Sequence, residues 1–209
     1  MNNFYLQTER VNYRPVSLQD AEFIVMLRNL PHAKKMIHGT SAEVEKQKEW
    51  IRDYLQRENE YYWIIESKDG KPVGTISLYH FDPINNQIES GRWVQLPGFS
   101  DSISLSGDVL FKDFAFNVLK VSRIVSDTAC FNKQVIKYHK FLGERIFDRV
   151  KDDVEINGEK VEVVWFEEDS THWPDNRKKL LKFCGNESDR KAFRIEPDGT
   201  LTEIELYSK

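Results

Sequence analysis

The sequence predicts an α+β fold in which helices flank a mostly antiparallel sheet. Three observations support this class. Residues 60–67 and 72–82 alternate apolar and polar side chains around a short turn, which is typical of a hairpin. Residues 88–94 alternate in the same way and run through a loop of small residues into an amphipathic helix. Further strands follow that helix, so that the chain crosses over between a fourth and a fifth strand.

The composition is that of one main domain. The chain has 209 residues, of which 40% are hydrophobic, and no Pro/Gly-rich or low-complexity stretch divides it. Its formal net charge of −4 argues against a general nucleic-acid binder, because such proteins neutralise phosphates with Lys and Arg. Cys130 and Cys184 are far apart, which indicates neither a disulfide framework nor a zinc site. We therefore expect a protein of the reducing cytoplasm.

Membrane attachment and metal binding are not expected either. The first ten residues, MNNFYLQTER, lack the basic and apolar regions of a signal peptide, and no apolar run approaches the length that spans a bilayer. The histidines show no His-x-x-x-His or His-Glu pairing, which argues against a metal site. They are His32, His38, His80, His139 and His172.

The N-terminal half is predicted to begin with a strand and two helices. Residues 11–16 form the strand, and Ser17 with Asp20 makes a capping-box-like start for a helix that carries apolar residues as far as Leu30. A second helix follows at about residues 42–57. The hairpin described above then supplies the second and third strands.

The fourth strand and the central helix are the part around which the chain is organised. Alternation places Glu89, Gly91 and Trp93 on one face of the strand, so that a carboxylate lies beside an open backbone. Small residues follow Pro97, and apolar residues recur at helical spacing over residues 109–119. We expect the loop to lead into the positive end of a helix, which favours an anion. The alternative is a solvated Ser/Asp loop without a ligand.

The C-terminal half adds strands, a short helix and a tail. Residues 121–130 are predicted to form a buried strand, and the next helix opens at Asn132 and closes at Gly143. Two strands at about residues 145–151 and 161–167, joined by an Asn-Gly turn, complete the sheet.

The last forty residues are predicted to form a C-terminal appendage. A helix over residues 174–183 precedes an alternating hairpin. We divide the chain into a main domain of residues 1–170 and an appendage of residues 171–209. The appendage is assigned to packing or to a subunit contact, which leaves a homodimer open.

The stretch of residues 93–116 resembles the central motif of the GNAT superfamily of N-acetyltransferases, of the ribosomal-protein and amino-sugar type. In that family the fourth strand leads through a Gly-x-Gly-x-Ala/Gly loop to a long helix, and Ser100, Ser102 and Ser104 stand at the small-residue positions here. The resemblance covers roughly residues 10–168. It implies the GNAT fold, a mostly antiparallel mixed sheet of about six to seven strands, splayed between the fourth and the fifth.

The resemblance also implies acetyl-CoA as the cosubstrate. Main-chain N–H groups of the loop from Ser100 to Gly107 would hold its pyrophosphate, and the fourth strand would pair with the pantetheine amides. Two features depart from the family: serine lacks the φ freedom of glycine, and Asp101 puts a negative charge beside the anion. The residues implied in cofactor binding are Trp93, Val94, Ser100, Asp101, Ser102, Ile103, Ser104, Leu105 and Asn132.

Acetyl transfer from a thioester to an amine needs a base, an oxyanion donor and an acid. Glu89 lies on the strand where the family often carries a carboxylate base, and a solvent-facing or ion-paired residue is the alternative. The oxyanion donor, a backbone N–H in the family, would belong to Trp93 or Val94. The tyrosine that usually protonates the thiolate is replaced by His139, which can deliver a proton near neutral pH. The predicted catalytic residues are therefore Glu89 and His139.

Two other residues of this segment, Tyr138 and Glu144, are expected to take no part in the chemistry. Tyr138 lies about 100° round the helix and matches an apolar residue of the family, so we expect it to pack in the core. Glu144 replaces the usual Phe after Gly143, which weakens the expected local packing but touches no chemistry.

The acceptor is predicted from the segment RNLPHAKKMIHGT, which is similar to one in GNAT enzymes that acetylate amino-sugar nucleotides. Arg28, Asn29 and His38 fall where a substrate would bind, and ordinary polar residues at a helix end are the alternative. We therefore expect acetyl transfer to the primary amine of a small polar molecule such as an amino-sugar nucleotide. Two other functions stay open: acetylation of the N-terminal amine of a protein, as in the ribosomal-protein acetyltransferases, and a non-catalytic binding module that has kept the GNAT fold.

Overall fold

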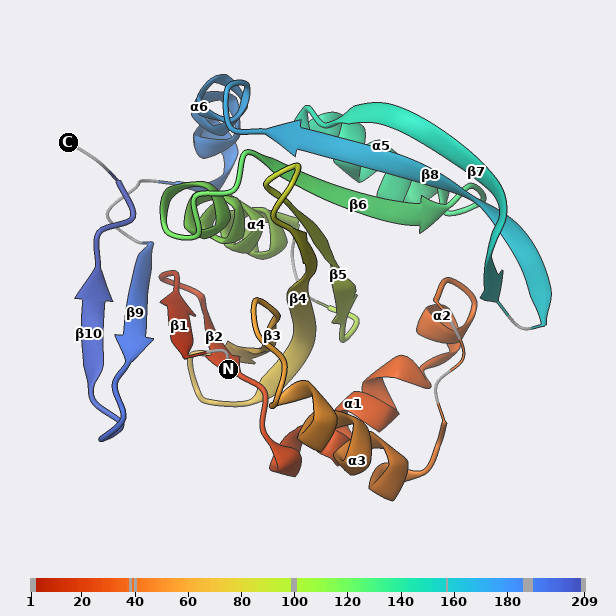
Figure 1. Cartoon of the computed structure of the whole chain (residues 1–209), viewed down its shortest axis with the longest axis horizontal. Coiled ribbons are helices and arrows are strands. Elements are labelled where there is room, and N and C mark those ends of the chain that lie inside the picture. Colours follow the sequence, from red (N-terminus) through yellow and green to blue (C-terminus); the bar gives the residue numbers. More distant parts are fainter. Residues whose placement is uncertain are drawn as a thin grey trace.

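The computed structural model of the chain describes residues 3–37, 39, 41–98, 101–156, 158–185 and 190–207. These residues form one ten-stranded sheet with helices on both faces (Figure 1). The strands are β1 (Phe4–Gln7), β2 (Val11–Pro15), β3 (Tyr61–Ser67), β4 (Pro72–Asp82), β5 (Gln87–Gln95), β6 (Arg123–Ala129), β7 (Arg145–Ile156), β8 (Glu159–Asp169), β9 (Lys191–Ile195) and β10 (Leu201–Ile204). The helices are η1 (Leu18–Asp20), α1 (Ala21–Arg28), α2 (Pro31–Lys34), α3 (Val44–Tyr54), α4 (Asp101–Asn117), α5 (Lys133–Leu142) and α6 (Trp173–Cys184).

The sheet has the order β10-β9-β1-β2-β3-β4-β5-β6-β8-β7. Neighbouring strands pair antiparallel except β5 and β6, which run parallel because α4 crosses over between them. The predicted fold class is confirmed. The sheet is wider than the six to seven strands expected, because the sequence pattern does not predict β1 and because the hairpin β9–β10 continues the sheet by pairing with β1.

β5 and β6 diverge after a short paired segment. Their register holds three pairs, the last of them between Glu89 and Val125. β6 continues along β8 on its other side, with which it pairs as far as Ala129. The splay expected between the fourth and the fifth predicted strands, here β5 and β6, is confirmed.

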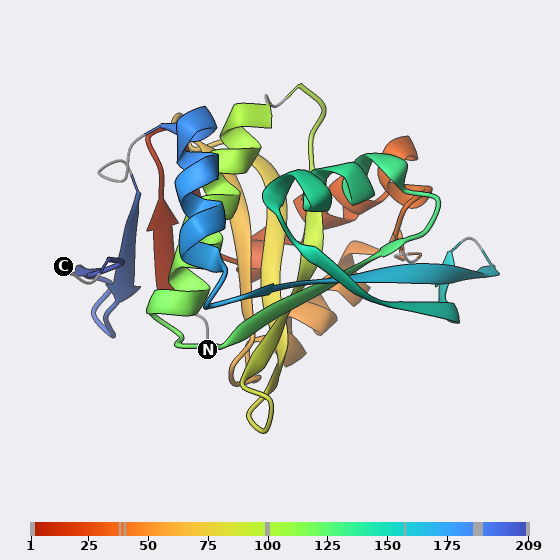
Figure 2. The same ribbon diagram turned by 90° about the horizontal axis from the view of Figure 1, so that it is seen from above.

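Two apolar layers cover the two faces of the sheet. On one face the buried side chains of Phe111 and Phe114 from α4 meet Trp63 of β3 edge to face. On the other face α1 and α3 pack against Tyr62 and Ile64. These two residues flank Trp63 on β3, so their side chains point to the opposite face of the sheet. Figure 2 shows α4 and α6 side by side on one face of the sheet, with α1 and α3 behind it.

The C-terminal helix α6 is tied to α4 through a buried carboxylate. Asp113 Oδ1 accepts hydrogen bonds from Trp173 Nε1 at 2.9 Å and from Arg177 Nε at 2.7 Å. Trp173 and Leu180 of α6 belong to the same buried core as α4 and β3. The last forty residues therefore share the main core and extend the main sheet.

Local signals in the sequence fix several element ends as expected. The backbone N–H of Ser17 donates to Asp20 Oδ2 at 2.7 Å, which completes the predicted capping box. Asn132 Oδ1 accepts the N–H of Val135 at 3.3 Å and begins α5, and Gly143 ends that helix with a left-handed φ of +89°.

The start of α4 differs from the prediction. The helix begins at Asp101, so the segment from Ser100 to Gly107 is not the expected loop; Ser100 lies outside the described residues, and the rest forms the first two turns of α4. Leu105 and Val109, four residues apart, are both buried, and they extend the apolar stripe of the helix toward its start.

Candidate active site

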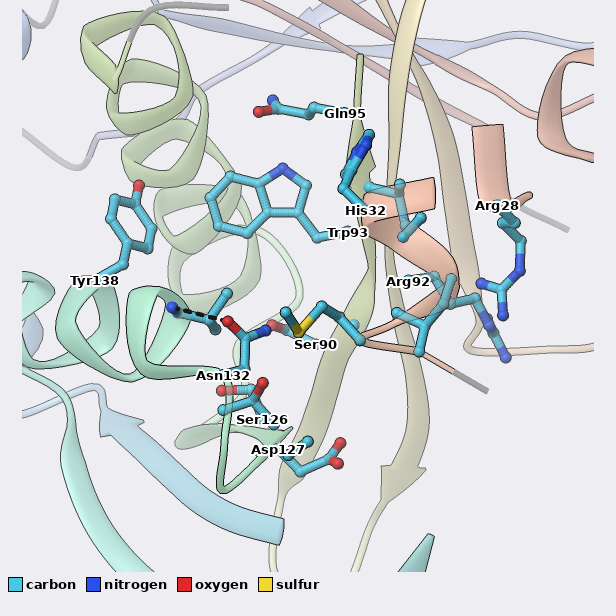
Figure 3. Close-up of a pocket in the computed structure, with 18 of the residues that line it drawn as sticks. Arg28, His32, Ser90, Arg92, Trp93, Gln95, Ser126, Asp127, Asn132 and Tyr138 are labelled. Atoms are coloured by element: carbon cyan, nitrogen blue, oxygen red, sulfur yellow. Dashed lines mark hydrogen bonds between the residues drawn. The ribbon is translucent and has the colours of Figure 1, made fainter. Parts of the chain in front are cut away.

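A cavity of about 1640 Å³ opens where β5 and β6 diverge. Its walls come from β5, from the end of β6, from α1 and α2, and from α5 (Figure 3). The predicted site residues that line it are Arg28, Glu89, Trp93, Val94, Ser104, Leu105, Asn132 and His139. The structure thus brings residues from four separate segments of the chain to one cleft.

Other predicted site residues are not placed in this cavity. Asn29 donates from Nδ2 to the carbonyl of Val25 at 2.8 Å and caps the end of α1, so its position does not support the predicted role in substrate binding. The side chain of Ile103 packs against the hydrophobic core that α4 shares with the sheet and does not line the cleft. The backbone of residues 101 and 102 begins α4, and His38 and Ser100 lie outside the described residues.

A β-bulge reshapes β5 at the centre of the site. The register with β4 shifts between Thr75 and Ser77, and Arg92 takes a left-handed φ of +52°. Thr75 Oγ1 donates to the carbonyl of Arg92 at 2.7 Å and Ser77 Oγ to that of Gly91 at 3.2 Å, which holds the irregular backbone in place. Bulges of this kind re-aim side chains next to active sites.

The bulge overturns the predicted alternation along this strand. Trp93 packs on the α4 face, where its ring centroid lies 5.4 Å from that of Tyr138, although strict alternation would place it on the face of Glu89. Arg92 lies on the opposite face with its guanidinium 4.1 Å above the ring of Tyr79. One extra residue in the strand therefore separates Trp93 from Glu89 across the sheet.

Glu89 lies at the last paired position of β5, at the base of the splay. Its side chain is 14% exposed, and Oε2 lies 3.0 Å from Nδ1 of the exposed His80. Burial, the charge of Glu89 and a hydrogen bond to its carboxylate raise the pKa of Tyr79, so this phenol stays neutral and donates to Glu89. Glu89 therefore has two side-chain partners, His80 and Tyr79, and it also lines the cavity.

Gly91 is required by the close approach of Tyr79. A Cβ at Gly91 would collide with the hydroxyl of Tyr79, with the ring carbons as the next nearest atoms at 3.1 Å. The glycine therefore allows the phenol to reach Glu89.

His139 is held by a buried chain of charged groups. Its Nδ1 lies 2.7 Å from Glu144 Oε2, and the imidazole stacks on Phe166 with a centroid distance of 4.4 Å. Glu144 Oε1 accepts a hydrogen bond from Lys112 Nζ at 2.6 Å, and Lys112 Nζ lies 3.3 Å from Asp108 Oδ2. Glu144 was expected to touch no chemistry, and the structure places its carboxylate in direct contact with the imidazole of the predicted acid.

Burial and pairing act against each other within this network. Burial alone would raise the pKa of Glu144, but Lys112 and His139 lower it to about 2. Burial raises the pKa of Asp108, and Lys112 offsets only part of that effect. Asp108 and Glu144 raise the pKa of Lys112 in spite of its burial, so this side chain is the fixed positive charge of the network.

Tyr138 packs against Trp93, as its expected place in the core requires. Burial raises the pKa of its phenol. Its hydroxyl is buried and has no hydrogen-bond partner among the described residues. The phenol and the indole together form the wall of the cavity on the α4 side (Figure 3).

The opposite wall carries two arginines (Figure 3). Arg28 and Arg92 lie on the same side of the cavity (Figure 3), and burial and the charge of Arg92 lower the pKa of Arg28. Arg92 also lies 5.1 Å from the ring centroid of Trp50, and its NH1 is 3.7 Å from Glu60 Oε2. This arginine wall, defined as Arg28 and Arg92, is therefore rigid and positively charged.

The residues around the cavity fit a CoA thioester. The start of α4 presents main-chain N–H groups that have no partner inside the helix, which is a favourable place for a diphosphate. Beyond Glu89, the side of β5 that faces β6 has no strand paired to it in the described part of the chain. An extended arm with amide groups can pair with such an edge.

Two other kinds of feature are missing from the described residues. None of their helices has both the length and the apolar character needed to cross a bilayer. They also contain no cluster of three or more His, Cys, Asp and Glu side chains arranged to hold a metal ion.

Several residues of the site were not predicted from the sequence. Arg92 and Tyr79 appear there as ordinary strand residues, because nothing local marks the bulge that brings them together. Asp108 and Lys112 do leave a signal, because opposite charges four residues apart on one helix predict an ion pair.

Comparison with known proteins agrees with this geometry. Residues 10–145 match the family described as acetyltransferase (GNAT) domain, and no protein of curated function matches the sequence. A solved structure described as apo FdhC, a nucleotide-linked sugar GNAT, is 26% identical and has a TM-score of 0.72; the alignment covers 88% of this chain and 99% of that one.

Two further solved structures share the fold at lower identity. A GCN5-related N-acetyltransferase from Brucella melitensis is 17% identical with a TM-score of 0.76, over 96% of this chain and 91% of that one. A mutant of the spermidine N-acetyltransferase SpeG from Vibrio cholerae is 15% identical with a TM-score of 0.68, over 78% and 95%. Since the family match spans more than half of the chain and includes both the splayed strands and α4, the protein belongs to the GNAT acetyltransferases.

Proposed function

We propose that this acetyltransferase moves an acetyl group from acetyl-CoA to the primary amine of a small acceptor that also carries negative charge. An amino-sugar nucleotide is the class that fits best. The observation that carries this proposal is the arginine wall of Arg28 and Arg92, which lines the cavity opposite Trp93 and Tyr138.

In this proposal acetyl-CoA supplies the activated acetyl group, and its diphosphate is held at the start of α4. The main-chain edge of β5 beyond Glu89 would pair with the pantetheine arm. The backbone N–H of Trp93 or Val94, next to the bulge, is the candidate donor to the oxyanion that forms when the amine attacks the thioester carbonyl.

Glu89 is the proposed base that takes the proton from the ammonium group of the acceptor. Its carboxylate lines the cavity and accepts a hydrogen bond from the neutral phenol of Tyr79. That hydrogen bond fixes the orientation of the carboxylate and leaves lone pairs for the amine or for a bridging water.

His139 is the proposed acid that protonates the thiolate when the C–S bond breaks. Because Glu144 occupies Nδ1, the proton would leave from Nε2. Glu144 and Lys112 orient the ring from behind, while Phe166 supports its face.

Charge decides between the acceptor classes that the neighbouring structures suggest. The similar sugar GNAT acts on a nucleotide-linked sugar, and the more distant SpeG acts on spermidine. Two adjacent guanidinium groups attract the diphosphate of a nucleotide sugar and repel a polyamine. Glu89 lies at the base of the splay, where it can meet an amine at the other end of the acceptor.

An acceptor panel tests the proposal. Purified protein with acetyl-CoA is given amino-sugar nucleotides, the same free amino sugars, spermidine and short peptides with a free N-terminus, and thiol release is followed. We expect turnover with a nucleotide-linked amino sugar and a kcat/KM at least about tenfold lower with the free sugar, since charge-assisted hydrogen bonds are lost. Preference for spermidine or for a peptide would refute the acceptor assignment.

A binding module that has kept the fold without catalysis is the remaining outcome. Acetyl-CoA that binds the folded protein must raise its melting temperature by mass action. No thermal shift at millimolar acetyl-CoA, together with no thiol release from any amine, would favour the module over the enzyme.

A further inference from the structure

Two exposed phenylalanines form an aromatic pair at the mouth of the cavity. Phe141 on α5 is 50% exposed and Phe183 on α6 is 63% exposed, yet their rings meet edge to face with a centroid distance of 5.5 Å. Both side chains line the cavity. Large apolar side chains that are exposed side by side at a cleft indicate a surface for a ligand.

The pair lies next to the start of α4. Arg190 links the two helices there, because it donates from Nη2 to the carbonyl of Cys184, at the end of α6, and from Nε to the carbonyl of Ser106, in the second turn of α4. Figure 2 shows α4, α5 and α6 gathered on one face of the sheet. The end of α6, which carries Phe183, is thus tied to the second turn of α4, near the main-chain N–H groups to which we assign the diphosphate.

Each phenylalanine has a lysine one helical turn before it. Lys137 precedes Phe141 and Lys179 precedes Phe183 by four residues, so each lysine shares a face of its helix with the phenylalanine. Both lysines are exposed, and Lys137 also lines the cavity. An aromatic surface flanked by ammonium groups suits a nucleotide, because its planar base can stack on the rings while the phosphate on its ribose meets the ammonium groups.

We propose that Phe141 and Phe183 bind the adenine ring of the acyl-CoA, with Lys137 and Lys179 attracting its 3′-phosphate. This inference rests on the proposed use of acetyl-CoA. In CoA the adenosine is attached directly to the diphosphate. The pair of Phe141 and Phe183, called here the platform, lies near the start of α4, where the diphosphate is assigned, and so can reach the adenine. The nucleotide of the acceptor is assigned to the other wall, where the arginines lie.

The platform depends on a part of the chain outside the family match. That match ends at residue 145, whereas Phe183 belongs to α6. The C-terminal residues would therefore contribute directly to cosubstrate affinity, in addition to their place in the core.

Titration calorimetry with CoA, dephospho-CoA and acetyl-pantetheine tests the inference. Base–aromatic stacking predicts that Phe183→Ala raises the Kd for CoA and for dephospho-CoA about tenfold, and that Phe141→Ala/Phe183→Ala raises it further. The double variant Lys137→Gln/Lys179→Gln should raise the Kd for CoA about tenfold but leave the Kd for dephospho-CoA unchanged. Turnover with acetyl-pantetheine, which has no adenine, should be the same in all variants.

Phe147→Ala is the matched control. Phe147 is 45% exposed on β7 and contacts Trp165, but it lies outside the cavity. Its removal should leave the Kd for CoA unchanged. Melting temperatures of all variants show whether a change in affinity reflects loss of fold.

The outcomes separate this inference from the proposed function. If the wild-type protein does not bind CoA, the proposed function fails. If it binds CoA and Phe141→Ala/Phe183→Ala binds equally well, the platform is refuted and acetyl transfer stands. If the double variant raises the KM for the acceptor while the Kd for CoA is unchanged, the pair serves the acceptor and the inference is likewise overturned.

Discussion

Replacement of Lys112 by methionine should destabilise the protein strongly. The side chain of Lys112 is 4% exposed and supplies the positive charge between Asp108 and Glu144, whose side chains are 7% and 6% exposed. Methionine keeps most of the side-chain volume but removes the ammonium group that the two carboxylates share. Removal of one partner from a buried ion pair costs about 3–5 kcal/mol, which in a chain of this size lowers the melting temperature by about 6–20 °C.

The pKa of Glu144 reflects the charges of both Lys112 and His139. It is lowered from an ordinary value of 4.5 to about 2, and at about 1.36 kcal/mol per unit this corresponds to about 3 kcal/mol in favour of the ionised form. Because the folded-state pKa is the lower one, this stabilisation is present above pH 4.5 and is lost as the pH falls through about 2. Without Lys112, the buried carboxyl groups should instead take up protons at a higher pH.

Urea unfolding of the wild type and of Lys112→Met, each at about pH 7 and about pH 5, measures both effects. We expect a deficit of about 3–5 kcal/mol at the higher pH that becomes smaller at the lower pH, since protonated carboxyl groups need no counter-charge. Lys46→Met is the control, because Lys46 pairs with Glu43 on the exposed surface of α3 and its loss should not move the midpoint. A deficit below about 1 kcal/mol, or one that is the same at both pH values, would refute the assigned network.

Four further substitutions test the site. Glu89→Gln should lower kcat by about 100-fold with little change in KM, and the defect should shrink at alkaline pH, where the amine is already neutral; a loss independent of pH would exclude the base role. Gly91→Ala should reduce kcat because its Cβ displaces Tyr79, and wild-type activity of Gly91→Ala would contradict this contact. Arg92→Lys should raise the KM for the acceptor about tenfold and leave the KM for acetyl-CoA unchanged. Arg57→Lys is the control, because Arg57 lies outside the cavity and its change should alter neither KM. Equal effects of Arg92→Lys on both substrates would argue against an acceptor contact. His139→Gln should lower turnover without changing the Kd for acetyl-CoA, and unchanged turnover would remove His139 from proton transfer.

Much of the fold could be predicted because its signals are local. The turn after β3 follows from Lys68-Asp69-Gly70-Lys71, and both ends of α5 follow from Asn132 and Gly143. These residues act on backbone groups a few positions away, so the neighbouring residues in the sequence suffice to predict the turn and the helix ends.

The parts that could not be predicted depend on partners far along the chain. The bulge at Arg92 is defined by the register with Thr75 and Ser77 across the sheet. Glu144 contacts His139 five residues earlier, but the positive charge that it binds, Lys112, lies 32 residues away on α4. The serines near the start of α4 suggest a loop, whereas the buried Leu105 continues the helical stripe and the helix begins at Asp101.

The position of β1 affects how the protein forms during synthesis. β1 lies between β2 and β9, and Phe4 pairs with Arg194, near the other end of the chain. A ribosome releases β1 long before β9 exists, so one edge of β1 stays open until β9 has been synthesised. Because this pairing joins strands far apart in the sequence, the nascent chain is exposed to aggregation through the open edge of β1 until β9 pairs with it.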